Sequence, residues 1–287
     1  MISLLKKLIQ GEKMSLFTVD QEKCAKDGIC QAVCPIGSIK VDGDKIPQPV
    51  TNAELMCMKC GHCVAACPND CFEHSGLNRD QFPLIQKDLE INHEQAIQFL
   101  RKRRSTREFK DNDIPNEELK KLIEYARYAP SGHNSQGAQW HVVNGKEKVK
   151  VIASHMIDWA RALVEKKPDF ATMMGLDIMI KKWESGADML LRGAPALVIT
   201  HANKNDVMSQ ATCTIALSYL ELAATTMGLG TCWAGYLHMA ANSYAPLQEA
   251  LGLPKENAFN GGMMVGYPRF KYKRVTQRNE PVITWSE

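Results

Sequence analysis

The chain has 287 residues, of which 45% are hydrophobic and 23% are charged. This is the composition of a folded globular protein, and it excludes disordered, collagen-like and fibrous classes. The 35 Lys and Arg residues nearly balance the 32 Asp and Glu residues, so net charge gives no reason to expect a nucleic acid or a membrane as partner. The length suits about two domains of roughly 100 to 200 residues each.

Residues 1–13 carry apolar side chains near helical spacing, at Ile2, Leu5 and Ile9. Two lysines interrupt them and no small-residue cleavage site follows, so a signal peptide is not expected. We interpret this segment as a surface helix, or as an extension ahead of a second start at Met14. A membrane anchor is the less favoured interpretation, because a single short segment binds bilayers weakly.

Ten cysteines are distributed unevenly, with eight of them between residues 24 and 71. Such crowding indicates either disulfides in an oxidising compartment or thiolate ligands for metal in a reducing one. Without a signal peptide the second interpretation is favoured, and we expect a cytoplasmic protein. The two remaining cysteines, Cys213 and Cys232, lie far along the chain.

The cysteine-rich segment repeats itself at an offset of 33 residues, which places Cys24, Cys30 and Cys34 on Cys57, Cys63 and Cys67. The second copy reads Cys57-x2-Cys60-x2-Cys63-x3-Cys67-Pro68, the spacing of bacterial iron–sulfur runs. Zinc sites more often use two separated cysteine pairs. The repeat therefore predicts two iron–sulfur clusters in preference to zinc.

The last cysteine of each such run binds the cluster of the other run, which predicts two ligand sets. One set is Cys34, Cys57, Cys60 and Cys63. The other is Cys24, Cys30 and Cys67, with Asp27 at the position equivalent to Cys60. A carboxylate binds iron less strongly than a thiolate. We expect a [4Fe–4S] cluster with Asp27 as a ligand, or else a [3Fe–4S] cluster. Cys71 is interpreted as a buried apolar residue outside the repeat.

Residues 14–76 resemble a two-cluster bacterial ferredoxin, a family that transfers single electrons at low potential. Within them, Ile36 to Val50 is expected to form a short hairpin. The polar stretch from Phe72 to Ile91 shows no periodicity, and we assign residues 77–91 to a linker. Residues 92–287 then form the second predicted domain.

The second domain is predicted to begin with a helix, because Asn92 and Gln95 match a capping box. Another helix opens at Asn116 and ends before Pro130. Short strands are expected at 140–143, 196–201 and 263–266, and a long helix at 207–227 that ends at Gly228. The apolar stretch from 215 to 237 contains Glu221 and is interpreted as core, not as a membrane span.

Five motifs follow one another in this domain. They are Arg103-Arg104-Ser105-Thr106-Arg107, Ala129-Pro130-Ser131-x-x-Asn134-Ser135-Gln136, Arg192-Gly193-Ala194-Pro195, Gly228-Leu229-Gly230-Thr231-Cys232-Trp233, and Val265-Gly266-Tyr267-Pro268 with Arg278 beyond it. Together they resemble the FMN-dependent nitroreductase family over residues 92–285. The whole chain resembles a fusion of ferredoxin and nitroreductase.

The resemblance implies an α+β fold, with a mixed sheet flanked by helices, and a homodimer with FMN at its interface. The residues that it assigns to the FMN phosphate and ribityl chain are Arg103, Arg104, Ser105, Arg107 and Arg278. The loop residues Pro130, Ser131, Gly132, Asn134 and Gln136 would reach the flavin from the other subunit. Backbone at Cys232, Trp233 and Gly235 would lie against the ring. Two positions depart from the common pattern: Arg107, often Lys in the family, and Gly137 after Gln136.

His133 and His141 are not expected to act as catalytic acids, because relatives take the proton from water. The preferred function is an oxidoreductase that passes electrons through two iron–sulfur clusters to FMN and on to an electron-poor acceptor, such as a nitroaromatic or a quinone. The donor is a reduced ferredoxin or flavodoxin, or NAD(P)H. The alternatives are an electron carrier or redox sensor without turnover and, least favoured, a nucleic-acid-binding iron–sulfur regulator, for which no helix-turn-helix signature is present.

Overall fold

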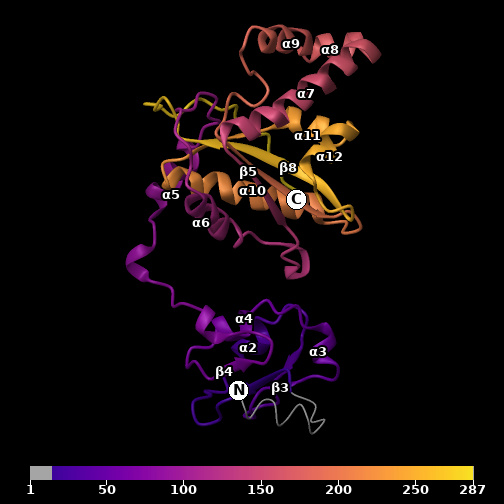
Figure 1. Ribbon diagram of the computed structural model, residues 1–287. Helices are drawn as coiled ribbons and strands as arrows, with labels where there is room; N and C mark the ends of the chain where they lie inside the picture. Colours follow the sequence, from indigo (N-terminus) through magenta and orange to yellow (C-terminus); the bar gives the residue numbers. More distant parts are fainter. Residues whose placement is uncertain (1–14, 287) are drawn as a thin grey trace. The chain divides into compact units, whose positions relative to one another are not determined.

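The computed structural model of the chain describes residues 15–286 (Figure 1), so the expected helix or extension at 1–13 lies outside the described residues. Two compact units divide between Glu90 and Ile91, and each is described by itself. The finer division of the first 90 residues into extension, domain and linker stays a prediction.

In the smaller unit, residues 15–90 are described, and they form two antiparallel strand pairs and three one-turn helices. Strand β1 (Phe17–Val19) pairs with β4 (Phe72–His74), and β2 (Ile39–Lys40) pairs with β3 (Gln48–Pro49). The helices are α2 (Ile29–Ala32), α3 (Ala53–Met56) and α4 (His62–Ala65). The hairpin expected within 36–50 is confirmed. The stretch from Phe72 to Ile91 is not wholly irregular, because its first three residues form β4, followed by 3-10 turns η1 (Arg79–Gln81) and η2 (Lys87–Leu89).

The sequence repeat is also a repeat of backbone conformation. Gly28 before α2 and Gly61 before α4 both have left-handed φ, of 73° and 77°. Lys26 and Lys59, at the same offset, have φ of 56° and 50°. A left-handed residue turns the chain sharply, so each cysteine run bends around a common centre before its short helix begins.

The larger unit is an α+β fold whose sheet has the strand order β5-β6-β8-β7. Its strands are β5 (Gln139–Asn144), β6 (Ala196–Asn203), β7 (Gly230–Trp233) and β8 (Asn257–Gly266), which pair antiparallel. A parallel bridge joins Ser105 to Thr231, so the pairing around β7 is mixed. All three predicted strands are present, although β8 begins earlier than expected.

Helices cover both faces of this sheet (Figure 1). The helices of the larger unit are α5 (His93–Lys102), α6 (Asn116–Ala126), η3 (Gly132–Asn134), α7 (Lys146–Lys166), α8 (Pro168–Met173), α9 (Leu176–Glu184), α10 (Ser209–Thr226), α11 (Gly235–Ala241) and α12 (Ala245–Leu251), of which α8 and α9 pack on α7. The predicted capping box is confirmed, since Asn92 Oδ1 accepts from Gln95 N at 2.9 Å and Gln95 Oε1 accepts from Asn92 N at 3.0 Å.

Two hydrophobic cores lie on opposite faces of the sheet. In β6, Leu197 and Ile199 pack in the core that includes α7, α11 and α12, whereas Ala196 and Val198 pack in the core that includes α6 and α10. The alternation is the two-residue period of a strand buried on both faces. Among the described residues, no helix has the length and apolarity needed to cross a membrane.

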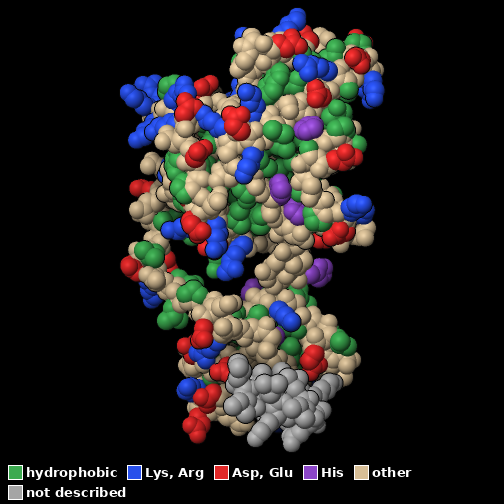
Figure 2. Space-filling model, in the orientation of Figure 1, with side chains coloured by type: hydrophobic (Ala, Val, Ile, Leu, Met, Phe, Trp, Pro, Cys, Tyr) green, Lys and Arg blue, Asp and Glu red, His purple; other side chains and the backbone are tan. Residues whose placement is uncertain are grey.

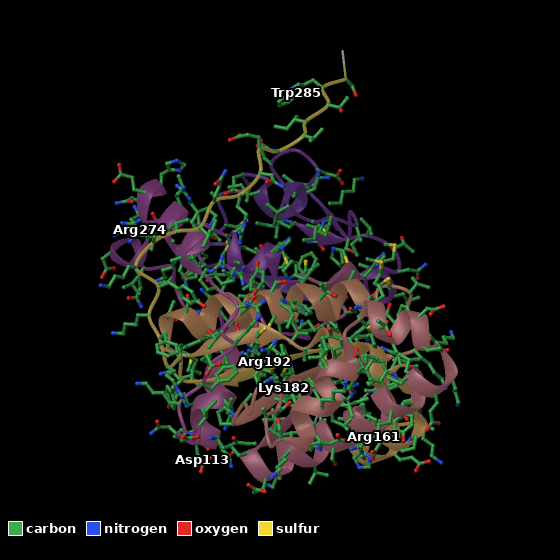
Figure 3. All side chains as sticks on the ribbon, turned by 90° about the horizontal axis from the view of Figure 1, so that it is seen from above. Asp113, Arg161, Lys182, Arg192, Arg274 and Trp285 are labelled. Atoms are coloured by element: carbon green, nitrogen blue, oxygen red, sulfur yellow. The ribbon has the colours of Figure 1, made fainter. Side chains whose placement is uncertain are left out.

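Residues 103–109 follow α5, and we call them the basic segment. Two glycines allow this segment to lie against the sheet. A Cβ at Gly230 would lie 2.8 Å from Pro268 Cγ and would overlap the side chain of Thr106. A Cβ at Gly266 would lie 2.8 Å from Pro195 Cδ and 2.5 Å from Phe109 Cδ1. The Gly-Leu-Gly and Val-Gly-Tyr-Pro motifs therefore serve close packing around residues 105–109. Residues 267–286, the described part of the chain after β8, form no helix or strand, and this segment carries Arg274 and Trp285 (Figure 3).

Candidate functional site

The smaller unit contains a cavity bordered by cysteines of both repeat copies. Cys34 comes from the first copy, and Cys57, Cys60 and Cys63 come from the second. The space enclosed by these side chains, including its opening to solvent, is about 400 Å³. These are the members of the first predicted ligand set, and we call this space the four-thiol cavity.

Backbone donors in the four-thiol cavity point at sulfur. Ser38 N donates to Cys34 Sγ at 3.2 Å, and Lys59 N donates to Cys57 Sγ at 3.4 Å. Ser38 Oγ is buried and has no hydrogen-bond partner among the described residues. Burial raises the pKa of Cys63 to about 11. Half-buried thiols are suited to bind iron as thiolates, with iron in place of their protons, and the donors beside them would stabilise the sulfurs.

A second cavity, of about 350 Å³ when its opening to solvent is included, is bordered by Cys24, Cys30 and Cys67, together with Asp27 and Cys71. We call it the mixed cavity. Asp27 is exposed, and its Oδ1 accepts a hydrogen bond from Ile29 N at 3.0 Å. The structure thus brings the second predicted ligand set together, with the carboxylate at its border. Whether Asp27 binds iron stays a prediction.

Cys71 lies in the mixed cavity, although sequence reasoning set it outside the repeat. Its Sγ is 3.3 Å from Cys67 Sγ, and its backbone N donates to that sulfur at 3.3 Å. Ser38 holds the same position relative to Cys34, at the offset of 33 residues. Burial, followed by the neighbouring Cys67 thiol, raises the pKa of Cys71 to about 12. The repeat therefore extends to residues 38 and 71, which the cysteine count alone did not reveal.

The cysteine cavities differ from a mononuclear metal site. Within residues 15–286, no three or more His, Cys, Asp or Glu side chains converge closely enough to hold one metal ion. The thiols instead surround open space, with donors directed at the sulfurs. The donor set and its spacing fit iron–sulfur clusters, whose sulfides also accept hydrogen bonds.

In the larger unit, two predicted phosphate-binding arginines meet at one hydroxyl. Arg104 donates to Thr276 Oγ1 at 2.7 Å, and Arg278 donates to the same oxygen at 3.3 Å. Arg104 Nε is buried without a hydrogen-bond partner among the described residues. Its guanidinium also lies 5.6 Å from the ring centre of Tyr272. Two guanidinium groups with an unused donor fit a phosphate. Figure 2 shows Lys and Arg side chains gathered at this edge of the larger unit.

Arg103 points instead to a buried acid. Its guanidinium donates to Glu221 Oε1 of α10 at 2.8 Å, and the two side chains are 25% and 9% exposed. This ion pair fixes the turn that follows α5 and occupies one donor of Arg103. Its predicted contact with the phosphate stays a prediction, to be made by the remaining donors.

Ser105, Arg107 and Cys232 form a second group beside β7. Thr106 N donates to Thr231 O at 2.8 Å, which holds the basic segment along this strand. Burial raises the pKa of the Cys232 thiol, against the opposing charges of Arg107 and Arg192. Trp233 and Gly235, which follow, are exposed. Of the three residues predicted to contact the ring, Trp233 and Gly235 are therefore accessible, whereas Cys232 is buried.

The loop from Pro130 to Gln136 has an unusual backbone. His133, Asn134 and Gln136 have φ of 52°, 51° and 48°. Left-handed backbone is uncommon outside glycine, and successive examples often accompany functional sites. Ser131 Oγ holds the loop by accepting a hydrogen bond from Gln136 N at 2.9 Å.

This loop is far from the basic segment of the same chain. A Cβ at Gly132 would lie 3.2 Å from Met208 Cγ, just before α10, whereas Glu221 lies thirteen residues further along. At a rise of 1.5 Å per residue along α10, Met208 and Glu221 are separated by about 20 Å. The predicted halves of the flavin site are therefore not brought together within one chain.

The structure places His133 and His141, which the sequence did not assign to catalysis, on different elements. His141 lies on β5, and burial lowers its pKa. His133 belongs to the strained loop and is exposed.

Sequence reasoning missed several side chains that the structure places at these sites. Glu221, Thr276, Ser38 and His74 contact or border predicted site residues. Of these, Glu221 gave a signal, since an acid within an apolar helical stretch requires a buried partner.

Comparisons with known proteins match each of the two units to a family. The model of the nitroreductase family matches residues 100–267, more than half of the chain. A model of the 4Fe-4S dicluster domain matches residues 17–68.

Two curated relatives are similar to the larger unit. One, from Archaeoglobus fulgidus, has a name that includes NAD(P)H nitroreductase; it is 24% identical over 176 residues, which are 61% of this chain and 87% of the relative. The other is an iodotyrosine deiodinase of Thermotoga neapolitana, 25% identical over 65% of this chain and 95% of its own. Among solved structures, a nitroreductase with bound FMN from Desulfitobacterium hafniense is 22% identical, with a TM-score of 0.54 over 69% of this chain and all of its own. This last likeness shows a shared fold.

Proposed function

Since the chain belongs to the nitroreductase family and joins that domain to a 4Fe-4S dicluster domain, we propose that it is an FMN-dependent oxidoreductase supplied with electrons through two iron–sulfur clusters. The observation that carries the proposal is the pair of cysteine cavities, each bordered by residues of both repeat copies. A chain that contains both iron–sulfur clusters and a domain of a flavin-binding family has the cofactors needed for electron transfer within the chain.

The residues of the smaller unit would each hold one corner of a cluster. Cys34, Cys57, Cys60 and Cys63 supply four thiolates in the four-thiol cavity. In the mixed cavity, Cys24, Cys30 and Cys67 supply three, and we propose that Asp27 supplies an oxygen ligand. Backbone N–H groups then stabilise the sulfur ligands, as those of Ser38 and Cys71 do for Cys34 and Cys67.

The residues of the larger unit would bind and orient FMN. Arg104 and Arg278 would grip its phosphate, with Ser105 and Arg107 along the ribityl chain and Arg103 held beside them by Glu221. Cys232, Trp233 and Gly235 would place backbone against the ring. Bound FMN would supply the exchange between one-electron and two-electron transfer.

A second copy of the chain would complete the site. Pro130, Ser131, Gly132, Asn134 and Gln136 form a strained loop about 20 Å from the basic segment of their own chain, by the rise of α10. We propose a homodimer in which this loop reaches the flavin of the partner. A site shared across a two-fold axis is common where each chain contributes a different surface.

The proposed acceptor is an electron-poor organic compound, such as a nitroaromatic or a quinone, that stacks over the flavin ring. The proposed donor is a reduced ferredoxin or flavodoxin acting through the clusters, with NAD(P)H as the other possibility. The proton would come from water, since neither His133 nor His141 is assigned a catalytic role.

An anaerobic turnover assay tests this function. We expect the dimer to reduce a nitroaromatic or a quinone much faster than free FMN at the same concentration. Equal rates would contradict an enzyme and would favour an electron carrier or redox sensor.

The donor is tested with a matched pair of proteins. With reduced ferredoxin, the wild type should reduce its flavin and Cys60→Ser should do so far more slowly, because its four-thiol cavity has lost one ligand. The control Cys213→Ala changes a cysteine in α10 and should behave as wild type. Rapid flavin bleaching by NADPH, before any change in the cluster signal, would contradict the ferredoxin donor.

A further inference from the structure

We propose that His74 tunes the cluster of the four-thiol cavity, by donating its Nε2–H to Cys57 Sγ and thereby raising the reduction potential. The inference rests on the proposed iron–sulfur function and adds to it a residue that is not a ligand. His74 acts on the cluster through Cys57 and does not react itself. One electron enters or leaves the cluster, and the Nε2 proton remains on the imidazole.

The hydrogen bonds of His74 define which ring nitrogen carries the proton. Nδ1 lies 3.0 Å from the backbone N of Gly76, which can only donate. A neutral imidazole has one donor and one acceptor nitrogen. Because Nδ1 accepts, Nε2 carries the hydrogen, and Nε2 lies 3.3 Å from Cys57 Sγ. The ring therefore donates to the sulfur of a predicted ligand.

The ring is held in place from both sides of its strand. His74 is 6% exposed and ends β4, where it pairs with Phe17 of β1. It borders the four-thiol cavity together with Cys57. The hydrogen bond from the backbone N of Gly76 to Nδ1 fixes the orientation of the ring.

The direction of the effect follows from electrostatics. Reduction adds negative charge to a cluster, and part of it resides on the thiolate sulfurs. A donor to sulfur stabilises the reduced state more than the oxidised state, and hydrogen bonds to the sulfurs are among the factors that set cluster potentials. In a buried site this stabilisation is stronger than in water. His74 should therefore make its cluster easier to reduce.

The two cavities differ at this position. At the offset of 33 residues, the counterpart of His74 is Val41, which has no donor in its side chain. The residues that border the mixed cavity include no histidine. Only the cluster of the four-thiol cavity would therefore have a histidine donor, and its reduction potential should differ from that of the other cluster for this reason.

Redox titration of the anaerobic full-length dimer, followed by EPR, tests the proposal. In His74→Phe the reduced-to-oxidised ratio of the four-thiol cluster at the wild-type midpoint should fall about tenfold, a shift of about 59 mV for one electron. His74→Gln, which restores an N–H donor, should recover part of this shift. The control His62→Phe removes an exposed histidine that borders the same cavity and should leave the midpoint unchanged.

Iron content distinguishes a failure of the tuning role of His74 from a failure of the proposed iron–sulfur function. Full iron content with an unchanged midpoint in His74→Phe, or equal shifts in both clusters, would overturn the tuning role while leaving the clusters intact. Absence of iron from the wild type would overturn the proposed function itself. If His74→Phe does not fold, wild-type protein with isotope-labelled histidine provides the answer by pulsed EPR: a histidine nitrogen coupled to the reduced four-thiol cluster supports the bond, and no coupling contradicts it.

Discussion

In the smaller unit, the thiols of the four-thiol cavity come from residues 34 to 63, whereas in the larger unit Arg104 meets Arg278 at Thr276. The first site is closed by neighbours in the sequence that wrap one centre. The second site is formed by segments that are distant in the sequence, and the loop at 130–136 lies away from it. We expect the first site to depend on single ligands, and the second on the packing that brings its segments together.

The strongest test of a locally closed site is removal of one ligand. In Cys60→Ser we expect the loss of about four iron atoms per chain, because a thiolate corner of the cluster is gone. Iron and sulfide analysis of anaerobically purified protein measures this. Cys213→Ala is the control and should retain full iron. Unchanged iron in Cys60→Ser would contradict the assigned ligand set.

The predicted phosphate site of the larger unit should depend on the ion pair between Arg103 and Glu221, which fixes the basic segment. Glu221→Ala leaves the partly buried Arg103 without its partner, and we expect a loss of about 3 kcal/mol in the free energy of unfolding. Urea denaturation of the apo-protein measures it.

A matched control for this variant is the exposed pair of Arg161 and Glu184, with side chains 45% and 58% exposed. Glu184→Ala should cost less than about 1 kcal/mol. Equal losses in both variants would show that burial of Glu221 contributes nothing.

A smaller effect is expected where one of several phosphate contacts is removed. Arg104→Gln should weaken FMN binding about 30-fold, since a hydrogen bond to a charged group contributes roughly 1.5–3 kcal/mol. Fluorescence titration of apo-protein with FMN measures the Kd. Arg274→Gln removes a charge from the exposed C-terminal segment and should change the Kd little. An unchanged Kd in Arg104→Gln would remove this arginine from the site.

The smallest change is expected at Asp27. If its carboxylate already binds the fourth iron, Asp27→Cys should leave the iron count per chain unchanged. It should alter only the EPR signal of that cluster, because a thiolate replaces an oxygen ligand. A gain of about one iron atom per chain would show that the native cluster has three irons.

Much of the smaller unit could be predicted because its information is local. Cysteine spacing and the offset of 33 residues were enough to divide the predicted ligands into the two sets that border the two cavities. The role of residues 38 and 71 was missed because Ser and Cys at this shared position do not look alike. His74 was missed because its contact with Cys57 depends on strand pairing, which the polar stretch did not reveal.

In the larger unit, the α+β fold, the capping box at Asn92 and the three strands followed from pattern and resemblance. The long amphipathic helix α7 and helices α8 and α9 were not predicted, because residues 146–184 contain none of the five motifs. Thr276 could not be found from sequence, since a hydroxyl in an irregular segment carries no pattern. Its role depends on two arginines that only the tertiary structure brings to it.

The central claim, that one chain holds two iron–sulfur clusters and a flavin, is tested most directly by cofactor analysis of protein purified without oxygen. Iron, acid-labile sulfide and FMN should be measured per chain in one preparation. We expect about eight iron atoms, four for each cluster, about as many sulfides, and about one FMN. A protein that contains its iron but no FMN, or that holds zinc in place of iron, would contradict the claim.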